Sequence, residues 1–266
     1  MNAIAKERNA GKKGKQENGI TEGVIWKQLL IFFFPILFGT FFQQLYNTVD
    51  AVIVGRFVGK EALAAVGGST GTLINLLVGF FVGLSSGATV IISQFYGGGR
   101  EKRVSEAVHT AIAFSLACGV GLMVIGIAAS PIALRAMGTP EDIMQYSLSY
   151  IRIYFLGIIP NLVYNMGAGI LRAIGDSKRP LYYLMASCFT NIVLDLVLVV
   201  WLRLDVRGAA IATIVSQLVS AVLVVLQLLR TKDSYKLVIR KIRLNLFMVM
   251  RIVRIGLPAG LQSVMY

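Results

Sequence analysis

Acidic residues are scarce in this chain, and this scarcity makes the position of each one informative. The 266 residues include 13 Asp and Glu against 26 Lys and Arg, and charged residues of both signs make up only 15% of the total. Hydrophobic residues reach 56%, and the mean hydropathy is +0.72. These values lie outside the usual range for a water-soluble domain and indicate a membrane protein.

Cysteine and histidine are also rare. The two cysteines, Cys118 and Cys188, both lie in apolar stretches, so a disulfide framework and a CxxC metal site are excluded. The single histidine, His109, falls near the start of an apolar stretch, where we expect a packed or water-contacting side chain rather than a proton relay. The glycines at 97–99 are not followed by the Lys-Ser/Thr pair of a phosphate-binding loop.

Long apolar runs, in contrast, are abundant. A bilayer core of ~30 Å needs about 20 residues of helix, and several runs reach that length. We expect spans at Leu29–Val54, Leu63–Phe95, Val104–Leu134, Tyr146–Leu171, Leu181–Leu202 and Ala209–Leu229, with a seventh beginning near Phe247. The longest should tilt, kink or project beyond the bilayer, and prolines 35, 160 and 258 should bend their helices. The predicted fold is an all-α polytopic membrane protein: a six-transmembrane-helix bundle plus a partial seventh helix.

The basic residues predict the orientation of these spans. With a cytoplasmic N-terminus, the inner side carries the basic tail, the clusters at 100–103 and 172–179, and the basic run between Arg230 and Arg254. The outer side carries only Arg56, Lys60, Arg135, Arg203 and Arg207. The positive-inside rule therefore predicts a multi-pass protein of the plasma (inner) membrane with its N-terminus in the cytoplasm. The net charge of +13 then reflects topology, and nucleic acid is not expected as a partner.

Four segments are expected along the chain. They are a basic cytoplasmic tail (1–22), an N-terminal six-helix lobe (23–230), a cytoplasmic inter-lobe linker (231–248) and the start of a C-terminal lobe (249–266). The linker mixes basic residues with Leu237, Val238, Ile242 and Leu244, which predicts an amphipathic segment on the inner membrane surface. A faint repeat supports two related halves, because a basic residue leads an apolar run to a proline both at 27–35 and at 251–258.

Two aspartates, Asp50 and Asp195, lie deep inside apolar stretches, where an ionisable group is by default a functional-site hypothesis. Asp50 precedes Arg56 by ~9 Å of helical rise and Asp195 precedes Arg203 by ~12 Å, so both lie at a similar depth in the outer half. Thr213 and Tyr150 enter from the same side to comparable levels, and Asn191 shares the face of Asp195. We expect these groups to converge on one polar pocket.

Such a pocket could serve a proton or a metal cation. A low-dielectric environment favours the neutral form of a carboxyl group, and a second carboxylate nearby favours it further, so the pair could exchange protons near neutral pH. Alternatively, Asp50 and Asp195 could coordinate Na⁺ together with amide and hydroxyl oxygens. A purely structural role is the competing interpretation: each acid would be satisfied by Asn, Thr or Tyr and would hold helices together. Gly79, Gly83 and Gly87 are spaced for close helix packing.

Several strings resemble the multidrug and toxic compound extrusion (MATE) family of secondary transporters. They are QQLYNTVD at 43–50 continuing to Val54-Gly55, EALAAVG at 61–67, LRAIGD at 171–176 before Pro180, NIVLD at 191–195 and GAAIAT at 208–213. The resemblance runs from about Thr21 to Tyr266 and covers the N-terminal lobe plus the start of the seventh helix.

The resemblance implies more than composition does. MATE proteins have twelve helices in two lobes and export organic cations or drugs in exchange for H⁺ or Na⁺. The family's first-lobe cation site maps onto Asp50, Asn191 and Asp195, with Thr213 in the same network and Tyr150 as a weaker match. We therefore expect an antiporter and not an enzyme, with no cofactor besides the coupling ion. This chain would be incomplete and would need the second lobe.

Two alternatives remain open. A lipid-linked-sugar flippase of the same superfamily should line its cavity with several basic residues, whereas the spans here contain almost none. An intramembrane aspartyl protease also uses two membrane aspartates, but its family favours Tyr-Asp and Gly-x-Gly-Asp contexts. Here Val49 precedes Asp50 and Leu194 precedes Asp195.

Overall fold

The computed structural model describes residues 25–265, and this part of the chain is helical and contains no strand. The expected basic tail at 1–22 lies outside these residues. The α-helices are α2 (Ile25–Phe57), α3 (Lys60–Gly67), α4 (Ser69–Gly97), α5 (Glu101–Ala136), α6 (Glu141–Leu156), α7 (Ile158–Ala173), α8 (Lys178–Asp195), α9 (Asp205–Arg230) and α10 (Leu246–Met265). A π-helix, η1 (Leu196–Trp201), extends α8, and a short 3-10 turn, η2 (Ile239–Lys241), lies between α9 and α10.

The predicted spans are all present. Six helical segments are long and apolar enough to cross a membrane, and the bent pair α6–α7 makes a seventh when it is counted as one span. Every segment matches one of the apolar runs expected from the sequence, including the one that begins near Phe247. The chain is therefore a multi-pass membrane protein with the expected all-α bundle.

The long spans break where glycine and proline occur. The second span is interrupted at Gly68, which separates α3 from α4. The fourth bends by 50° at Gly157, three residues before Pro160. A proline there removes the N–H that would bond to the carbonyl of residue 156, and its ring crowds that carbonyl, so the helix cannot continue straight. In contrast, α2 and α10 each remain a single helix through Pro35 and Pro258.

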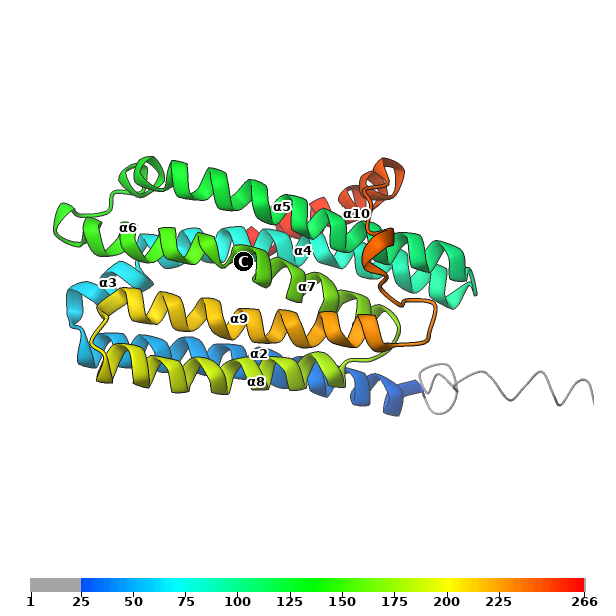
Figure 1. The fold of residues 1–266 in the computed structure, drawn as a ribbon, viewed down its shortest axis with the longest axis horizontal. Coiled ribbons are helices and arrows are strands. Elements are labelled where there is room, and N and C mark those ends of the chain that lie inside the picture. Colours follow the sequence, from blue (N-terminus) through cyan, green and yellow to red (C-terminus); the bar gives the residue numbers. More distant parts are fainter. Residues whose placement is uncertain (1–24, 266) are drawn as a thin grey trace, which may run out of the picture.

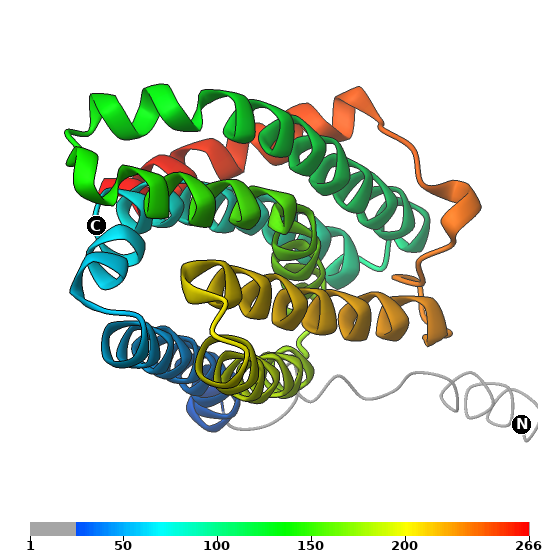
Figure 2. The same ribbon diagram turned by 60° about the vertical axis from the view of Figure 1, so that its left-hand side comes forward.

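Successive spans run in opposite directions, so their connections gather at two ends of the bundle (Figure 1). One end holds the connections α4–α5, α7–α8 and α9–α10, which carry most of the basic residues. Figure 2 shows α9 lying between the α2–α8 pair and the layer formed by α4, α5, α6 and α7. The packing agrees with this view, because α8 contacts both α2 and α9, and α9 contacts α6 and α7.

Helix α10 packs along α4 through glycines, as the small-residue spacing predicted. A Cβ on Gly83 would collide with the backbone of Gly260, and a Cβ on Gly87 would collide with the backbone at Ile252 and Gly256. The two helix backbones therefore approach each other as closely as their atoms allow. This contact holds α10 against the preceding helices.

The segment between α9 and α10 differs from the predicted amphipathic segment on the membrane surface. It is mostly extended, with only the η2 turn, and Tyr235 and Leu237 are buried in the core with residues of α5 and α9. The ring of His109 accepts a 3.0 Å hydrogen bond from the backbone N–H of Val238 at its Nε2 atom. The tertiary contact therefore overrides the local amphipathic pattern and holds the connector on the end of the bundle.

Candidate functional site

The five residues predicted to form the site are all buried, and they come from four helices. Asp50 lies on α2, Tyr150 on α6, Asn191 and Asp195 on α8, and Thr213 on α9. Helix α8 packs against α2 and α9, and α9 packs against α6, which brings the four helices together. Helices α2 and α8, which carry Asp50 and Asp195, pack directly against each other. That the five residues form one functional site stays a prediction.

Most of the polar side-chain atoms of this cluster have no hydrogen-bond partner among residues 25–265. These are Oδ1 of Asp50, both carboxylate oxygens of Asp195 and both amide atoms of Asn191. Thr213 turns its hydroxyl back to the carbonyl of Ala209 at 3.0 Å, so it satisfies its own helix rather than the acids. The structural interpretation, in which neighbouring side chains satisfy each aspartate, does not describe this arrangement. An unpartnered buried polar group costs about 1–3 kcal/mol, so the cluster is expensive as it stands.

A cavity of about 330 Å³ lies beside the cluster. Asp50, Tyr150 and Thr213 line it, together with Asn47 and Tyr154. Asn191 and Asp195 do not line it, and Asp195 is 0% exposed against 7% for Asp50. The expectation that the two carboxylates form opposing walls of one pocket was therefore wrong for Asp195. Helix α8, which carries Asp195, packs against both α2 and α9.

The backbone changes form directly after Asp195. Residues Leu196–Trp201 form a π-helix, which contacts α2 and α9. A π-helical turn is rare, and it is frequent at functional sites because it displaces side chains from their regular α-helical positions. Asp195 therefore lies at the junction between two helix types.

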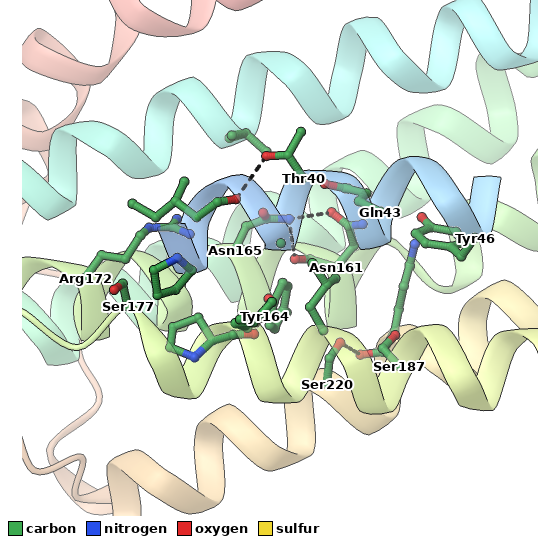
Figure 3. Close-up of a pocket in the computed structure, with 18 of the residues that line it drawn as sticks. Thr40, Gln43, Tyr46, Asn161, Tyr164, Asn165, Arg172, Ser177, Ser187 and Ser220 are labelled. Carbon is green, nitrogen blue, oxygen red and sulfur yellow. Dashed lines mark hydrogen bonds between the residues drawn. The ribbon is translucent and has the colours of Figure 1, made fainter. Parts of the chain in front are cut away.

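A second cavity, of about 300 Å³, lies between α2, α7, α8 and α9 (Figure 3). It shares Gln43, Tyr46 and Asn161 with the first, so the two cavities are neighbours. In Figure 3, Tyr46 lies at one end of this cavity, and Arg172 and Ser177 lie at the other. Asn165 donates hydrogen bonds from Nδ2 to the Asn161 side chain at 3.0 Å and to its backbone carbonyl at 2.9 Å. Together the cavities form a polar interior along the bundle.

Sequence reasoning missed several of these lining residues. Arg172 was assigned to an inner loop, but it lies in the last turn of α7 and lines the second cavity. The spacing along the helix could have predicted that Arg172 lies in the cavity. Asn165 and Arg172 follow Asn161 by four and eleven residues, so the three side chains share one face of α7. Tyr154 follows Tyr150 by four residues, and their rings stack with centroids 6.4 Å apart.

The described residues contain no group of three or more His, Cys, Asp or Glu side chains that could hold a metal ion. Asp50 and Asp195 supply two carboxylates, and side-chain amides and hydroxyls also line the cavity beside Asp50. This donor set suits a proton or a weakly bound hard cation rather than a transition metal.

Comparisons with known proteins identify the family of this chain. The MatE family model matches residues 35–197, which is more than half of the chain. The chain belongs to the MATE family. The match covers α2 through α8 and contains four of the five predicted site residues.

Among curated relatives of this MATE chain is the probable multidrug resistance protein YoeA of Bacillus subtilis. It is 32% identical over 248 residues, which cover 91% of this chain and 53% of the relative. The multidrug export protein MepA of Staphylococcus aureus is 22% identical over 241 residues, again covering 91% of this chain and 53% of the relative.

Solved structures show the same fold. A MOP-superfamily transporter from Pyrococcus furiosus has 27% identity and a TM-score of 0.82, over 94% of this chain and 55% of its own. A multidrug resistance MATE transporter in an outward-facing conformation has 26% identity and a TM-score of 0.84, over 94% of this chain and 55% of its own. The chain therefore spans about half the length of the relatives it matches.

Proposed function

We propose that this MATE chain is part of a secondary active antiporter, and not an enzyme, that exports organic cations or drugs in exchange for H⁺ or Na⁺. The observation that carries the proposal is the pair Asp50 and Asp195, which are buried inside membrane-spanning helices. Oδ1 of Asp50 and both carboxylate oxygens of Asp195 have no hydrogen-bond partner in the described part of the chain. The relatives named as multidrug resistance or export proteins support the same class of function.

The coupling step follows from electrostatics. Asp50 and Asp195 are both buried on helices that pack against each other. Two ionised carboxylates in a low-dielectric interior repel each other, so binding one cation or proton lowers the electrostatic energy. Asp50 is accessible from the cavity, whereas Asp195 is enclosed behind it. Asp50 is therefore the entry group, and the occupancy of Asp195 depends on a change in packing between α2 and α8. Such a change links ion binding to the shape of the cavity.

The cavity composition favours a cationic cargo. Among the residues that line the two neighbouring cavities, Arg172 is the only basic side chain. A flippase for a pyrophosphate-linked sugar would require several basic groups to bind its anionic substrate. Tyrosine rings at 46, 150 and 154 line the interior and can attract organic cations through their faces. The second lobe of the same transporter would supply the opposite wall of the substrate path.

The test is an efflux assay on the full-length protein with Asp50→Asn and Asp195→Asn. Each variant should fold and reach the membrane yet lose gradient-driven efflux, because Asn cannot exchange a proton or supply a negative charge. Asp205→Asn is a matched control, since this exposed aspartate has a φ of 52°, a conformation that Asn also adopts. Undiminished efflux in both site variants would refute the proposal.

The coupling ion is decided by a separate measurement. The full-length protein is reconstituted in liposomes, and drug flux is measured with an H⁺ gradient alone and then with a Na⁺ gradient alone. The gradient that drives flux in the wild type and not in Asp195→Asn identifies the ion. Flux under neither gradient would contradict ion-coupled export.

A further inference from the structure

A third cavity, of about 440 Å³, lies at the end of the bundle that carries most of the basic residues, away from Asp50 and Asp195. It forms between the first turns of α5 and the connector from α9 to α10, which Figure 1 shows crossing that end of the bundle. Four basic side chains line it: Lys102 from α5, and Arg240, Lys241 and Arg243 from the connector. The two contributing segments are more than a hundred residues apart in the chain.

The positive charge of this cavity is only partly balanced within the described part of the protein. Glu106 is the one acidic residue in its lining, and it is already paired with Arg103 at 3.2 Å. The other ion pair within residues 25–265 joins Arg179 to Asp176. Lys102, Arg240, Lys241 and Arg243 therefore have no acidic partner there. Four like charges around one cavity repel one another unless an anion lies between them.

Hydrogen bonds hold one wall of this cavity in place. His109 is buried in its lining, and its Nδ1 lies 2.6 Å from the carbonyl of Ser105 while its Nε2 accepts the Val238 N–H. These two bonds assign the neutral tautomer with the proton on Nδ1. The imidazole therefore anchors the connector next to Arg240 and Lys241 without adding charge, and holds the basic side chains beside α5.

Exposed apolar side chains lie next to these basic residues in the sequence. Ile239 is 68% exposed, Leu244 is 53% exposed, and Leu246 and Phe247 in the first turn of α10 are 76% and 61% exposed. A free phosphate ion makes no favourable contact with these apolar side chains. The acyl chains of a lipid pack against them. Basic side chains interleaved with apolar ones on the inner face of a membrane protein are suited to an anionic lipid.

We propose that the cavity between α5 and the α9–α10 connector is a binding site for the phosphate-bearing headgroup of an anionic lipid of the inner leaflet. Arg240, Arg243, Lys241 and Lys102 bind the phosphate, and Ile239, Leu244, Leu246 and Phe247 contact the acyl chains. The site is independent of the ion-coupling site and does not rest on the transport function. Its occupation joins the connector to α5 and fixes where α10 begins relative to the first six spans.

The test is native mass spectrometry of the 266-residue chain in detergent, titrated with dihexanoylphosphatidylglycerol. The double variant Arg240→Gln/Arg243→Gln should bind this lipid about 30-fold more weakly, since two basic contacts are lost. Lys232→Gln/Lys236→Gln is the matched control, because it removes the same charge from exposed positions of the same connector that do not line the cavity. The control should bind as the wild type does.

Further arms separate the sources of the anion. Dihexanoylphosphatidylcholine should bind poorly, and inorganic phosphate or glycerol 3-phosphate should not displace the anionic lipid at equal concentration. Displacement by either soluble anion would overturn the lipid assignment. Equal weakening in both double variants, or equal binding of the choline lipid, would overturn the site itself, because it would leave only general charge attraction.

Discussion

At the scale of a single residue, Asp195 carries a local cost to stability. It is fully enclosed, and neither of its carboxylate oxygens has a hydrogen-bond partner among the residues that the structure describes. Replacing an unsatisfied buried polar group with an apolar one of similar shape removes its desolvation cost. We expect Asp195→Leu to stabilise the chain by about 1–3 kcal/mol in sodium-free detergent solution.

Thermal unfolding of the purified chain measures this effect. Ser187→Ala serves as the comparison, since the Ser187 hydroxyl donates a 2.7 Å bond to the carbonyl of Ser216, and its loss should destabilise. A lower unfolding temperature for Asp195→Leu than for the wild type would show that the carboxylate is satisfied within the protein.

His109 acts at the same scale as an anchor for the connector. Phenylalanine at this position would fill the site but leave the Val238 N–H without its acceptor, so His109→Phe should open the connector more often. Losing one buried hydrogen bond predicts about tenfold faster tryptic cleavage at residues 236–243. Glutamine can place an oxygen where Nε2 lies, so His109→Gln should restore much of the protection. Equal cleavage of wild type and His109→Phe would contradict this role.

At the scale of elements, the contact between α4 and α10 depends on the absence of side chains. Gly83 faces the backbone of Gly260, so no larger residue fits without separating the helices. Gly83→Leu should lower the free energy of unfolding by about 1–3 kcal/mol, as overpacking typically does. Gly121→Leu on α5 is the control, because a side chain there meets nothing within 4 Å. Thermal unfolding of both variants in the same detergent compares them, and equal effects would mean that only helix propensity had changed.

The spans and the bend could be predicted from the sequence, whereas the connector could not, and the difference has a physical reason. The spans follow from local hydropathy, which each stretch of sequence carries by itself. The bend at Gly157 could be expected near Pro160 because proline removes a local backbone bond. In contrast, the amphipathic pattern of the connector at 231–245 predicted a segment on the membrane surface. Tyr235 and Leu237 instead pack against helices that are distant in the sequence, which the local pattern could not show.

At the scale of the whole molecule, the basic residues predict which side of the membrane each end occupies. In a background lacking Cys118 and Cys188, Lys232→Cys places a thiol in the connector and Glu141→Cys places one at the first residue of α6. In intact cells a membrane-impermeant maleimide should label position 141 and not position 232. Both should react after permeabilisation. Labelling of position 232 alone in intact cells would reverse the proposed orientation.

Hydropathy along the chain was enough to predict the number and order of the spans, and helical rise was enough to place Asp50 and Asp195 near the same end of the bundle. These properties depend on hydropathy and on the constant rise of a helix, and both can be counted along the chain. The MATE motifs added the expected partners Asn191 and Thr213.

The packing of helices that are distant in the sequence decided which of these groups reach a cavity. Asp50 lines one, Asp195 is enclosed behind it, and Arg172 points into its neighbour. It also brought Lys102 to the arginines of the connector. Such arrangements depend on how helices distant in the chain rotate and pack against one another, and no local pattern of residues specifies that rotation.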